Sequence, residues 1–126
     1  MTDKQVAHGR NLSPDQFGQT EIRLTDSATA ARNYTDSRIG RAFSAPDTVT
    51  RLDPHTLHPT QPIVYADQMQ NVKDGHASEK PITVIRHMGK DYIRDGHHRA
   101  VIAMQRGRKV AAHVVDVAAN IRKTFG

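Results

Sequence analysis

Residues 81–99 carry the sequence that decides the fold class, Pro81-Ile-Thr-Val-Ile-Arg-His-Met-Gly-Lys-Asp-Tyr-Ile-Arg-Asp-Gly-His-His-Arg99. The run 81–87 is rich in β-branched residues, the turn 88–90 contains a glycine, and 91–95 is a second short extended run. Two such runs joined by a short turn with glycine predict a β-hairpin. Gly96 then ends the second strand, and a helix is expected from the next residue.

The chain after this hairpin has a helical and then an extended pattern. Residues 97–106 place Val101 and Met104 three positions apart, and Gly107 follows as a C-terminal stop. Residues 109–117 carry apolar side chains on both alternating faces. That pattern is typical of a strand inside a sheet that is covered on both sides. We therefore expect a helix of about three turns, followed by an interior strand.

The chain before the hairpin predicts shorter elements. Residues 49–53 have the composition of a short strand, and residues 54–62 form a stiff, proline-rich connection. Residues 66–73 predict a short helix. The order strand, helix, hairpin, helix, strand predicts an α+β domain over residues 49–126, with a small mixed sheet and short helices.

Residues 1–48 are polar and have no sustained hydrophobic period, which predicts an N-terminal arm. Ser13-Pro14-Asp15 and residues 27–32 can each begin one helical turn. Neither has an apolar stripe wide enough to dock firmly on a core. We expect this arm to lie outside the domain that begins at residue 49.

The composition of the 126 residues narrows the functional classes. The chain has no cysteine, which excludes a disulfide scaffold, a thiolate zinc site and a cysteine nucleophile. Its net charge of +5 arises after residue 50, where twelve Lys and Arg face seven Asp and Glu. A basic surface favours DNA or nucleotides as partners. No apolar run approaches a membrane span and no signal peptide is recognisable, so a cytoplasmic protein is expected.

The turn Asp95-Gly96-His97-His98-Arg99 has the composition of an anion site. Glycine allows a ligand to approach the backbone, and the first N–H groups of a helix point outward with partial positive charge. Arg99 can bind phosphate oxygens with two parallel hydrogen bonds, while His97 and His98 supply groups whose charge changes near neutral pH. The sequence therefore predicts that this turn binds phosphate.

Asp95 has two interpretations. It can be the N-cap that satisfies the amides of His97 or His98. Alternatively it acts chemically, which requires a divalent cation such as Mg²⁺ or Mn²⁺ between its carboxylate and the phosphate. In the chemical interpretation Asp95 is a metal ligand, and either histidine acts as general acid or base.

Cations outside the turn are candidates for contacts with the phosphates of a longer ligand: Arg86, Lys90, Arg94, Arg106, Arg108 and Lys109. The alternative is that they only keep the surface solvated. Because almost no aromatic residue lies in this half of the chain, a protein that reads single-stranded bases by stacking is disfavoured. Contact with nucleic acid that is independent of sequence remains open.

The other histidines are weaker candidates for a functional role. His55 and His58 could bind metal if their segment were helical, but the neighbouring prolines favour a solvated loop. His76 and His87 are expected on the surface. His113 lies in the last predicted strand, where a hydrogen-bonded structural histidine is expected.

The run from about residue 49 to residue 117 resembles the ParB/sulfiredoxin superfamily, whose fold is often called the ParB-like nuclease domain. The matching features are the phrase Arg51-Leu-Asp-Pro-His55, the hairpin that ends in Ile93-Arg-Asp-Gly-His-His-Arg99, the small-residue helix and the closing strand. In such families the Gly-x-x-Arg turn binds the phosphates of a nucleotide. The resemblance therefore assigns phosphate binding to Gly96, His98 and Arg99.

The departures from these families limit what the resemblance implies. Sulfiredoxins are similar but have a reactive cysteine where this chain has His97, so sulfinic acid reduction is excluded. Chromosome-partition ParB proteins have a Gly-Glu-Arg-Arg turn and a following DNA-reading domain, which is not expected here because the sequence stops nine residues after Val117. The Asp-Gly-His-x-Arg form also resembles free-serine kinases of this fold, in which the aspartate region works with Mg²⁺.

Three functional hypotheses follow. The first is a ParB-like domain that binds DNA or nucleotide phosphates, including ATP or CTP, and cleaves a phosphodiester or phosphoanhydride bond with Mg²⁺ or Mn²⁺. The second is a non-catalytic DNA- or nucleotide-binding accessory module of a phage or mobile element. The third is a small-molecule kinase. A membrane partner is not expected.

Overall fold

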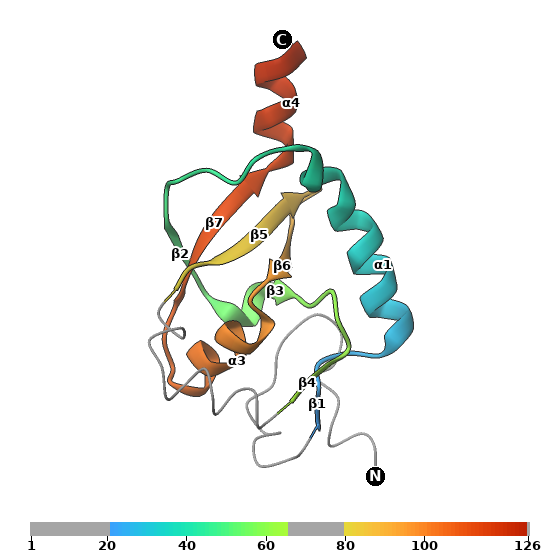
Figure 1. Ribbon diagram of the computed structural model, residues 1–126, viewed down its shortest axis with the longest axis vertical. Helices are drawn as coiled ribbons and strands as arrows, with labels where there is room; N and C mark the ends of the chain where they lie inside the picture. Colours follow the sequence, from blue (N-terminus) through green and yellow to red (C-terminus); the bar gives the residue numbers. More distant parts are fainter. Residues whose placement is uncertain (1–20, 66–79, 126) are drawn as a thin grey trace.

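The computed structural model describes residues 21–65 and 80–125 of the chain. A five-stranded mixed sheet forms its centre, in the order β2-β7-β5-β6-β3 (Figure 1). Its strands are β2 (Thr50–Leu52), β3 (Leu57–His58), β5 (Ile82–His87), β6 (Lys90–Asp95) and β7 (Val110–Asp116). β5 and β6 form the predicted antiparallel hairpin, and β7 runs parallel to β5 inside the sheet, as expected.

Helices and a second small sheet surround this centre. The helices are α1 (Ser27–Ser37), α3 (His97–Gln105) and α4 (Val117–Phe125), with the short 3-10 helices η3 (Arg38–Ala42) and η4 (Pro54–Thr56). β1 (Glu21–Arg23) pairs antiparallel with β4 (Ile63–Tyr65). The predicted α+β class with a mixed sheet and short helices is confirmed, and α3 begins at the predicted residue.

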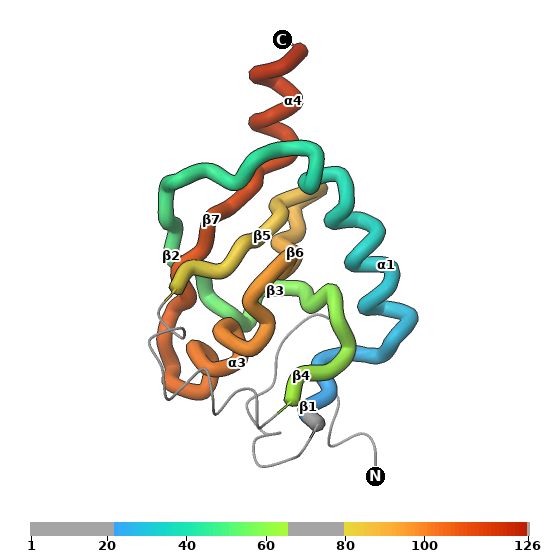
Figure 2. Tube along the Cα trace, in the orientation of Figure 1, coloured from blue at the N-terminus to red at the C-terminus, as the bar shows by residue number. Residues whose placement is uncertain are grey.

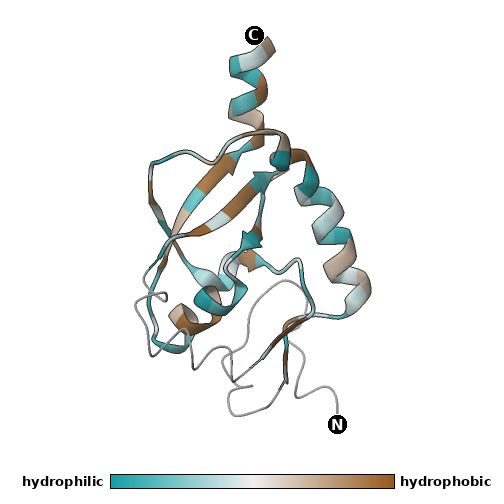
Figure 3. Ribbon diagram, viewed as in Figure 1, coloured by the Kyte–Doolittle hydropathy of each residue, from teal (hydrophilic) through white to brown (hydrophobic). Residues whose placement is uncertain are grey.

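The two faces of the main sheet bear two separate clusters of buried side chains. Because side chains alternate along a strand, Val84 and Ile93 lie in the cluster that includes α3, whereas Ile85 and Tyr92 lie in the other. The second cluster lies under α1 and η3, since the Tyr92 hydroxyl donates to Asp36 of α1 at 3.3 Å. Figure 2 shows α1 and α3 on different sides of the strands. This double cover explains why the apolar residues of β5 and β7 lie inside the molecule (Figure 3).

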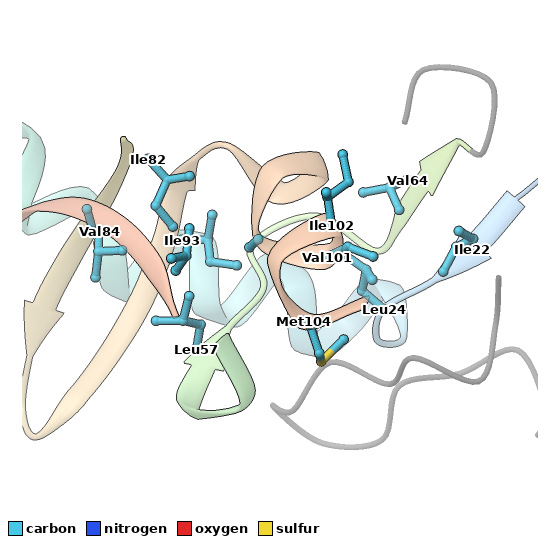
Figure 4. Packing of buried hydrophobic residues seen from close by; sticks show 13 residues of the cluster. Ile22, Leu24, Leu57, Val64, Ile82, Val84, Ile93, Val101, Ile102 and Met104 are labelled. Atoms are coloured by element: carbon cyan, nitrogen blue, oxygen red, sulfur yellow. The ribbon is translucent and has the colours of Figure 1, made fainter. Parts of the chain in front are cut away.

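The larger cluster joins α3 to the small sheet. Figure 4 shows Val101 and Ile102 of α3 beside Leu24 and Val64, and each of these side chains is at most 1% exposed. Burying a side chain of this size contributes about 1.5–3 kcal/mol to folding. Ile22 and Leu24, which precede residue 48 in the sequence, are therefore part of the core that supports α3.

A helix begins at Ser27 as expected, but the expectation that it is a single, weakly docked turn is wrong. α1 continues to Ser37, and its N-cap Asp26 accepts a hydrogen bond from the Thr29 amide at 2.7 Å. It docks through a buried polar contact instead of an apolar stripe, since the Asn33 side chain donates to the Pro59 carbonyl at 2.8 Å. The division of the chain at residue 48 into arm and domain stays a prediction.

Some expectations fall outside the described residues, namely the helix at 66–73 and the turn at 13–15. α4 was not expected. It extends away from the sheet, with Val117 buried and Phe125 80% exposed. Within the described ranges, no helix has the length and apolar character needed to span a membrane.

Candidate functional site

A cleft of about 430 Å³ opens where β6 meets α3. Its lining consists of Gln61, Lys80, Arg94, Asp95, Gly96, His97, His98 and Arg99. All five residues of the turn singled out in the sequence therefore lie around this one cleft. Gln61 and Lys80 were not anticipated, because they come from segments that only the folded chain brings beside the turn.

Gly96 makes the abrupt change of direction from β6 to α3 possible. Its φ of 104° lies in the left-handed region, where residues with a side chain are strained. A Cβ at this position would also lie 2.7 Å from Cβ of Ile82. The position therefore requires glycine on two independent grounds.

Gly96 is also the N-cap of α3, and no side chain caps the helix. The first helical hydrogen bond runs from the Ala100 amide to the Gly96 carbonyl at 2.9 Å. The interpretation of Asp95 as the N-cap is thus wrong, because the extra residue with positive φ separates its carboxylate from the helix start. The partial positive charge of that helix end faces the cleft without a carboxylate cap.

Arg99 is held in one position on the cleft wall. Its Nη1 donates to the Pro81 carbonyl at 2.8 Å and to the Lys80 carbonyl at 3.3 Å, and its Nη2 approaches Asp95 Oδ2 at 3.3 Å. The side chain is only 18% exposed. Arg99 therefore ties the start of β5 to α3 and leaves part of its guanidinium at the cleft surface.

The charges in the lining are unbalanced. Lys80, Arg94 and Arg99 are cationic, whereas Asp95 is the single carboxylate among the described residues of the lining. The Asp95 side chain is 73% exposed, so water weakens its pairing with Arg99. The excess of positive charge favours an anionic ligand.

His97 is turned into the protein. It is 4% exposed, and its Nε2 accepts a hydrogen bond from the Thr60 backbone N–H at 2.9 Å. Burial, with a smaller contribution from the nearby His98, lowers the pKa of His97 to about 3. The ring is therefore neutral at physiological pH, and this geometry favours a positioning role over proton transfer.

The residues around Thr60 form a small polar anchor beneath the cleft. The Thr60 hydroxyl donates to the Ile93 carbonyl at 2.6 Å, and Asn33 holds the preceding carbonyl of Pro59. His97 completes this anchor from α3. One loop is thus fixed by β6, α1 and α3 together.

His98 is the half-buried histidine of the pair. Its Nε2 accepts a long hydrogen bond of 3.5 Å from the Tyr65 backbone N–H. Unlike His97, the side chain remains at the cleft surface. Of the two histidines, His98 is the one placed to meet a ligand.

The six other candidate cations divide among three places. Arg94 lines the cleft, while Arg106, Arg108 and Lys109 line a second cleft at the other end of α3. Arg86 and Lys90 lie at the far end of the hairpin. There Arg86 is bound by Asp91 through contacts of 2.8 and 3.0 Å, and this pairing raises the pKa of Arg86.

The structure separates the histidines that were weighed as metal ligands. His55 binds its neighbour Asp53 at 2.9 Å, whereas His58 lies in β3 with its ring 5.5 Å from that of Tyr92. The expectation of a solvated loop is wrong for His58, which is 9% exposed. In residues 21–65 and 80–125, no group of three potential His, Asp or Glu ligands is placed to hold a metal. His113 makes the expected structural contact, with its Nδ1 3.1 Å from the Thr48 carbonyl.

Comparisons with known proteins find a structural resemblance but no relative by sequence. No protein-family model matches the chain, and no curated protein matches it. Among solved structures, the crystal structure of sulfiredoxin from Arabidopsis thaliana is similar, with a TM-score of 0.46 and 16% sequence identity. The match covers 64% of this chain and 99% of that one. Membership in the ParB/sulfiredoxin superfamily, expected from the turn, stays a prediction.

Proposed function

We propose that this protein binds the phosphate groups of a nucleotide or nucleic acid in the cleft at the start of α3. The observation that carries the proposal is the combination of three cations with a helix N-terminus that no side chain caps. Such a helix end attracts anions through its partial positive charge. Gly96 contributes its positive φ, which turns the chain so that the helix start lies at the cleft.

The cations of the cleft have different parts in this proposal. Arg94 and Lys80 are exposed and can move to a phosphate that enters the cleft. Arg99 is fixed by two backbone carbonyls, so it offers a charge that needs no reorganisation when the ligand binds. His97 keeps the helix start in register with the Thr60 loop.

A second candidate function is hydrolysis of the bound phosphate ester or anhydride with a divalent cation. The exposed carboxylate of Asp95 favours it, because a carboxylate inside a cationic cleft repels phosphate unless a cation lies between them. Mg²⁺ typically takes one or two carboxylates and completes its shell with water and substrate phosphates. One carboxylate, that of Asp95, is enough for that pattern. The ion would then arrive already bound to the phosphates of the nucleotide.

In this hydrolytic form His98 is the proton carrier. Water adds to phosphorus, the bond to the leaving oxygen breaks, and His98 takes the proton of the water. The leaving oxygen takes a proton from solvent and His98 releases its own proton to solvent, so that atoms and charge balance. His97 does not take part, because its ring is buried away from the cleft surface.

Thermal shift measurements test phosphate binding. ATP, CTP, GTP, their diphosphates and pyrophosphate are each added to the wild type and to Arg94→Gln/Lys80→Gln. A ligand at 100 times its Kd stabilises the folded state by about 2.7 kcal/mol, which raises the melting temperature. We expect a rise for at least one phosphate ligand that the double variant loses. If no phosphate ligand shifts the wild type, the proposal is wrong.

Incubation with plasmid DNA and with ATP tests hydrolysis. The wild type is compared with Asp95→Ala, His98→Ala and the control His87→Ala, whose histidine lies at the far end of β5. We expect turnover that requires Mg²⁺ or Mn²⁺ and that the first two variants lose. Binding without divalent-dependent turnover would leave the protein a binding module.

A further inference from the structure

A second cleft, of about 350 Å³, lies at the opposite end of α3. It is formed by β2, the C-terminal half of α3 and the start of β7. Its lining contains five cations, which are Arg51, Lys80, Arg106, Arg108 and Lys109. The remaining lining residues, Ile102, Ala103, Val110 and Ala111, are apolar. Among the described residues this lining contains no carboxylate, so the second cleft also favours an anionic ligand.

Local backbone structure brings these cations together. Gly107 ends α3 with a φ of 64°, and its amide donates to the Met104 carbonyl at 3.1 Å. The Arg108 amide donates to the Ala103 carbonyl at 2.9 Å, which completes a Schellman motif. Arg51 reaches the same surface because its strand pairs with β7 opposite Ala111.

The C-terminal dipole of α3 does not account for so much positive charge. A helix C-terminus carries about half a negative charge, and one or two cations of the last turn suffice to complement it. Here Arg51 and Lys80 are added from other elements. Asp53 lies in a neighbouring cleft with Arg108 and Lys109. Hydrogen bonds from His55 and, to a smaller extent, the nearby charge of Lys109 lower the pKa of Asp53, so this carboxylate offsets part of the positive charge at Lys109.

Lys80 lines both clefts and so joins them into one basic track along α3. The helix has 9 residues, which at 1.5 Å per residue gives a length of about 14 Å. A strand of duplex nucleic acid presents a phosphate about every 3.4 Å of axis. About four nucleotides therefore span the track.

We propose that the second cleft binds the phosphodiester backbone of a nucleic acid, so that the ligand of this protein is a polynucleotide and not a free nucleotide. The inference rests on the proposed function for the contact at the first cleft. A free nucleotide carries its charge in a single phosphate chain and neutralises one cleft, whereas a polynucleotide neutralises both. Because the described residues of both linings include no Phe, Tyr or Trp, the contact is to the backbone and does not select sequence.

Fluorescence anisotropy with a labelled 20-nucleotide DNA, single-stranded and duplex, tests this inference. The full chain is compared with Arg108→Gln/Lys109→Gln, which changes two exposed residues of the second cleft. The matched control is Arg122→Gln/Lys123→Gln, which removes the same charge from exposed positions on α4, away from α3 (Figure 1). Each protein is titrated at several salt concentrations between about 50 and 200 mM. Pyrophosphate binding and urea unfolding are measured in parallel.

We expect the first variant to weaken DNA binding and to reduce the steepness of its salt dependence by about two units of log K per log salt. Its affinity for pyrophosphate and its stability stay unchanged. The α4 control keeps most of the wild-type slope. Equal losses in both double variants would show diffuse attraction and overturn the inference, as would a wild type that binds no DNA. A wild type that binds DNA but does not bind pyrophosphate would instead overturn the proposed function.

Discussion

The Nε2 atom of His97 on α3 accepts a hydrogen bond from the backbone N–H of Thr60 at 2.9 Å. This bond joins the first residue of α3 to a loop that is 37 residues earlier in the chain. It also fixes the tautomer, because Nε2 must be unprotonated to accept. The start of the helix is therefore held by a neutral imidazole, and the cleft above it depends on that neutrality.

Acid should weaken the fold through His97. The pKa of His97 in the folded state is about 3, below the ordinary value of 6.5. Between these two pH values the unfolded chain binds a proton at His97 and the folded chain does not. This contribution to stability is present above pH 6.5 and is lost as the pH falls from there toward 3. The slope in that window approaches about 1.4 kcal/mol per pH unit. Urea unfolding between pH 7.5 and 5 measures it.

The control for this effect is His113→Gln, which changes a half-buried histidine on β7. We expect His97→Gln to lower stability at pH 7.5 and to reduce the loss between pH 7.5 and 5 by about 2 kcal/mol. The His113 variant keeps the wild-type pH dependence. If the His97 variant loses stability with pH as steeply as the wild type, His97 is not the group responsible.

Alanine at Gly96 should disrupt the start of α3. The added Cβ would lie 2.7 Å from Ile82 Cβ, in a backbone region that already disfavours side chains. We expect a loss of about 2–4 kcal/mol in the free energy of unfolding. Gly89→Ala is the matched control, because Gly89 also has positive φ but has open space around it. That variant should lose only about 1 kcal/mol.

Asp95→Asn should have opposite effects with and without a divalent cation. In EDTA the substitution removes a negative charge next to the phosphate, which should tighten ATP binding about fivefold, or about 1 kcal/mol. With Mg²⁺ it removes the carboxylate ligand and should weaken binding. Isothermal titration under both conditions separates the two effects. A change in the same direction under both conditions would contradict a metal-binding role for Asp95.

Arg99→Lys should destabilise the fold although the charge is kept. A lysine cannot reproduce the two hydrogen bonds from Nη1 to the carbonyls of Pro81 and Lys80. We expect a loss of about 1–2 kcal/mol in urea unfolding. Arg94→Lys, at an exposed position of the same cleft, should change stability by less than about 0.5 kcal/mol. Equal stability of the two variants would mean that Arg99 does not tie β5 to α3.

The part of the fold that the sequence predicts best is the part built from local patterns. The hairpin, α3 and β7 follow one another in the chain, and each carries its own period of apolar residues. α1 could not be anticipated in the same way. It docks through Asn33 and small side chains, and its partner Pro59 lies 26 residues away.

In the candidate site too, the sequence predicts the features that are local in the chain and not those that depend on distant segments. The turn from Asp95 to Arg99 is contiguous, so its chemistry could be recognised from composition. The sequence does not indicate that His97 turns inward, because that depends on Thr60 from a distant loop. Nor does it indicate that Lys80 stands between the two clefts, since only the pairing of β5 with its neighbours brings this residue beside α3.

The most direct test of phosphate binding at the start of α3 is a titration of the ¹⁵N-labelled full chain with pyrophosphate, followed by amide NMR. The account predicts saturable shifts that are largest at Gly96, His97, His98 and Arg99, and that Arg94→Gln/Lys80→Gln abolishes. Shifts that are absent from these four amides while others saturate, or no saturable shift at all, would contradict it.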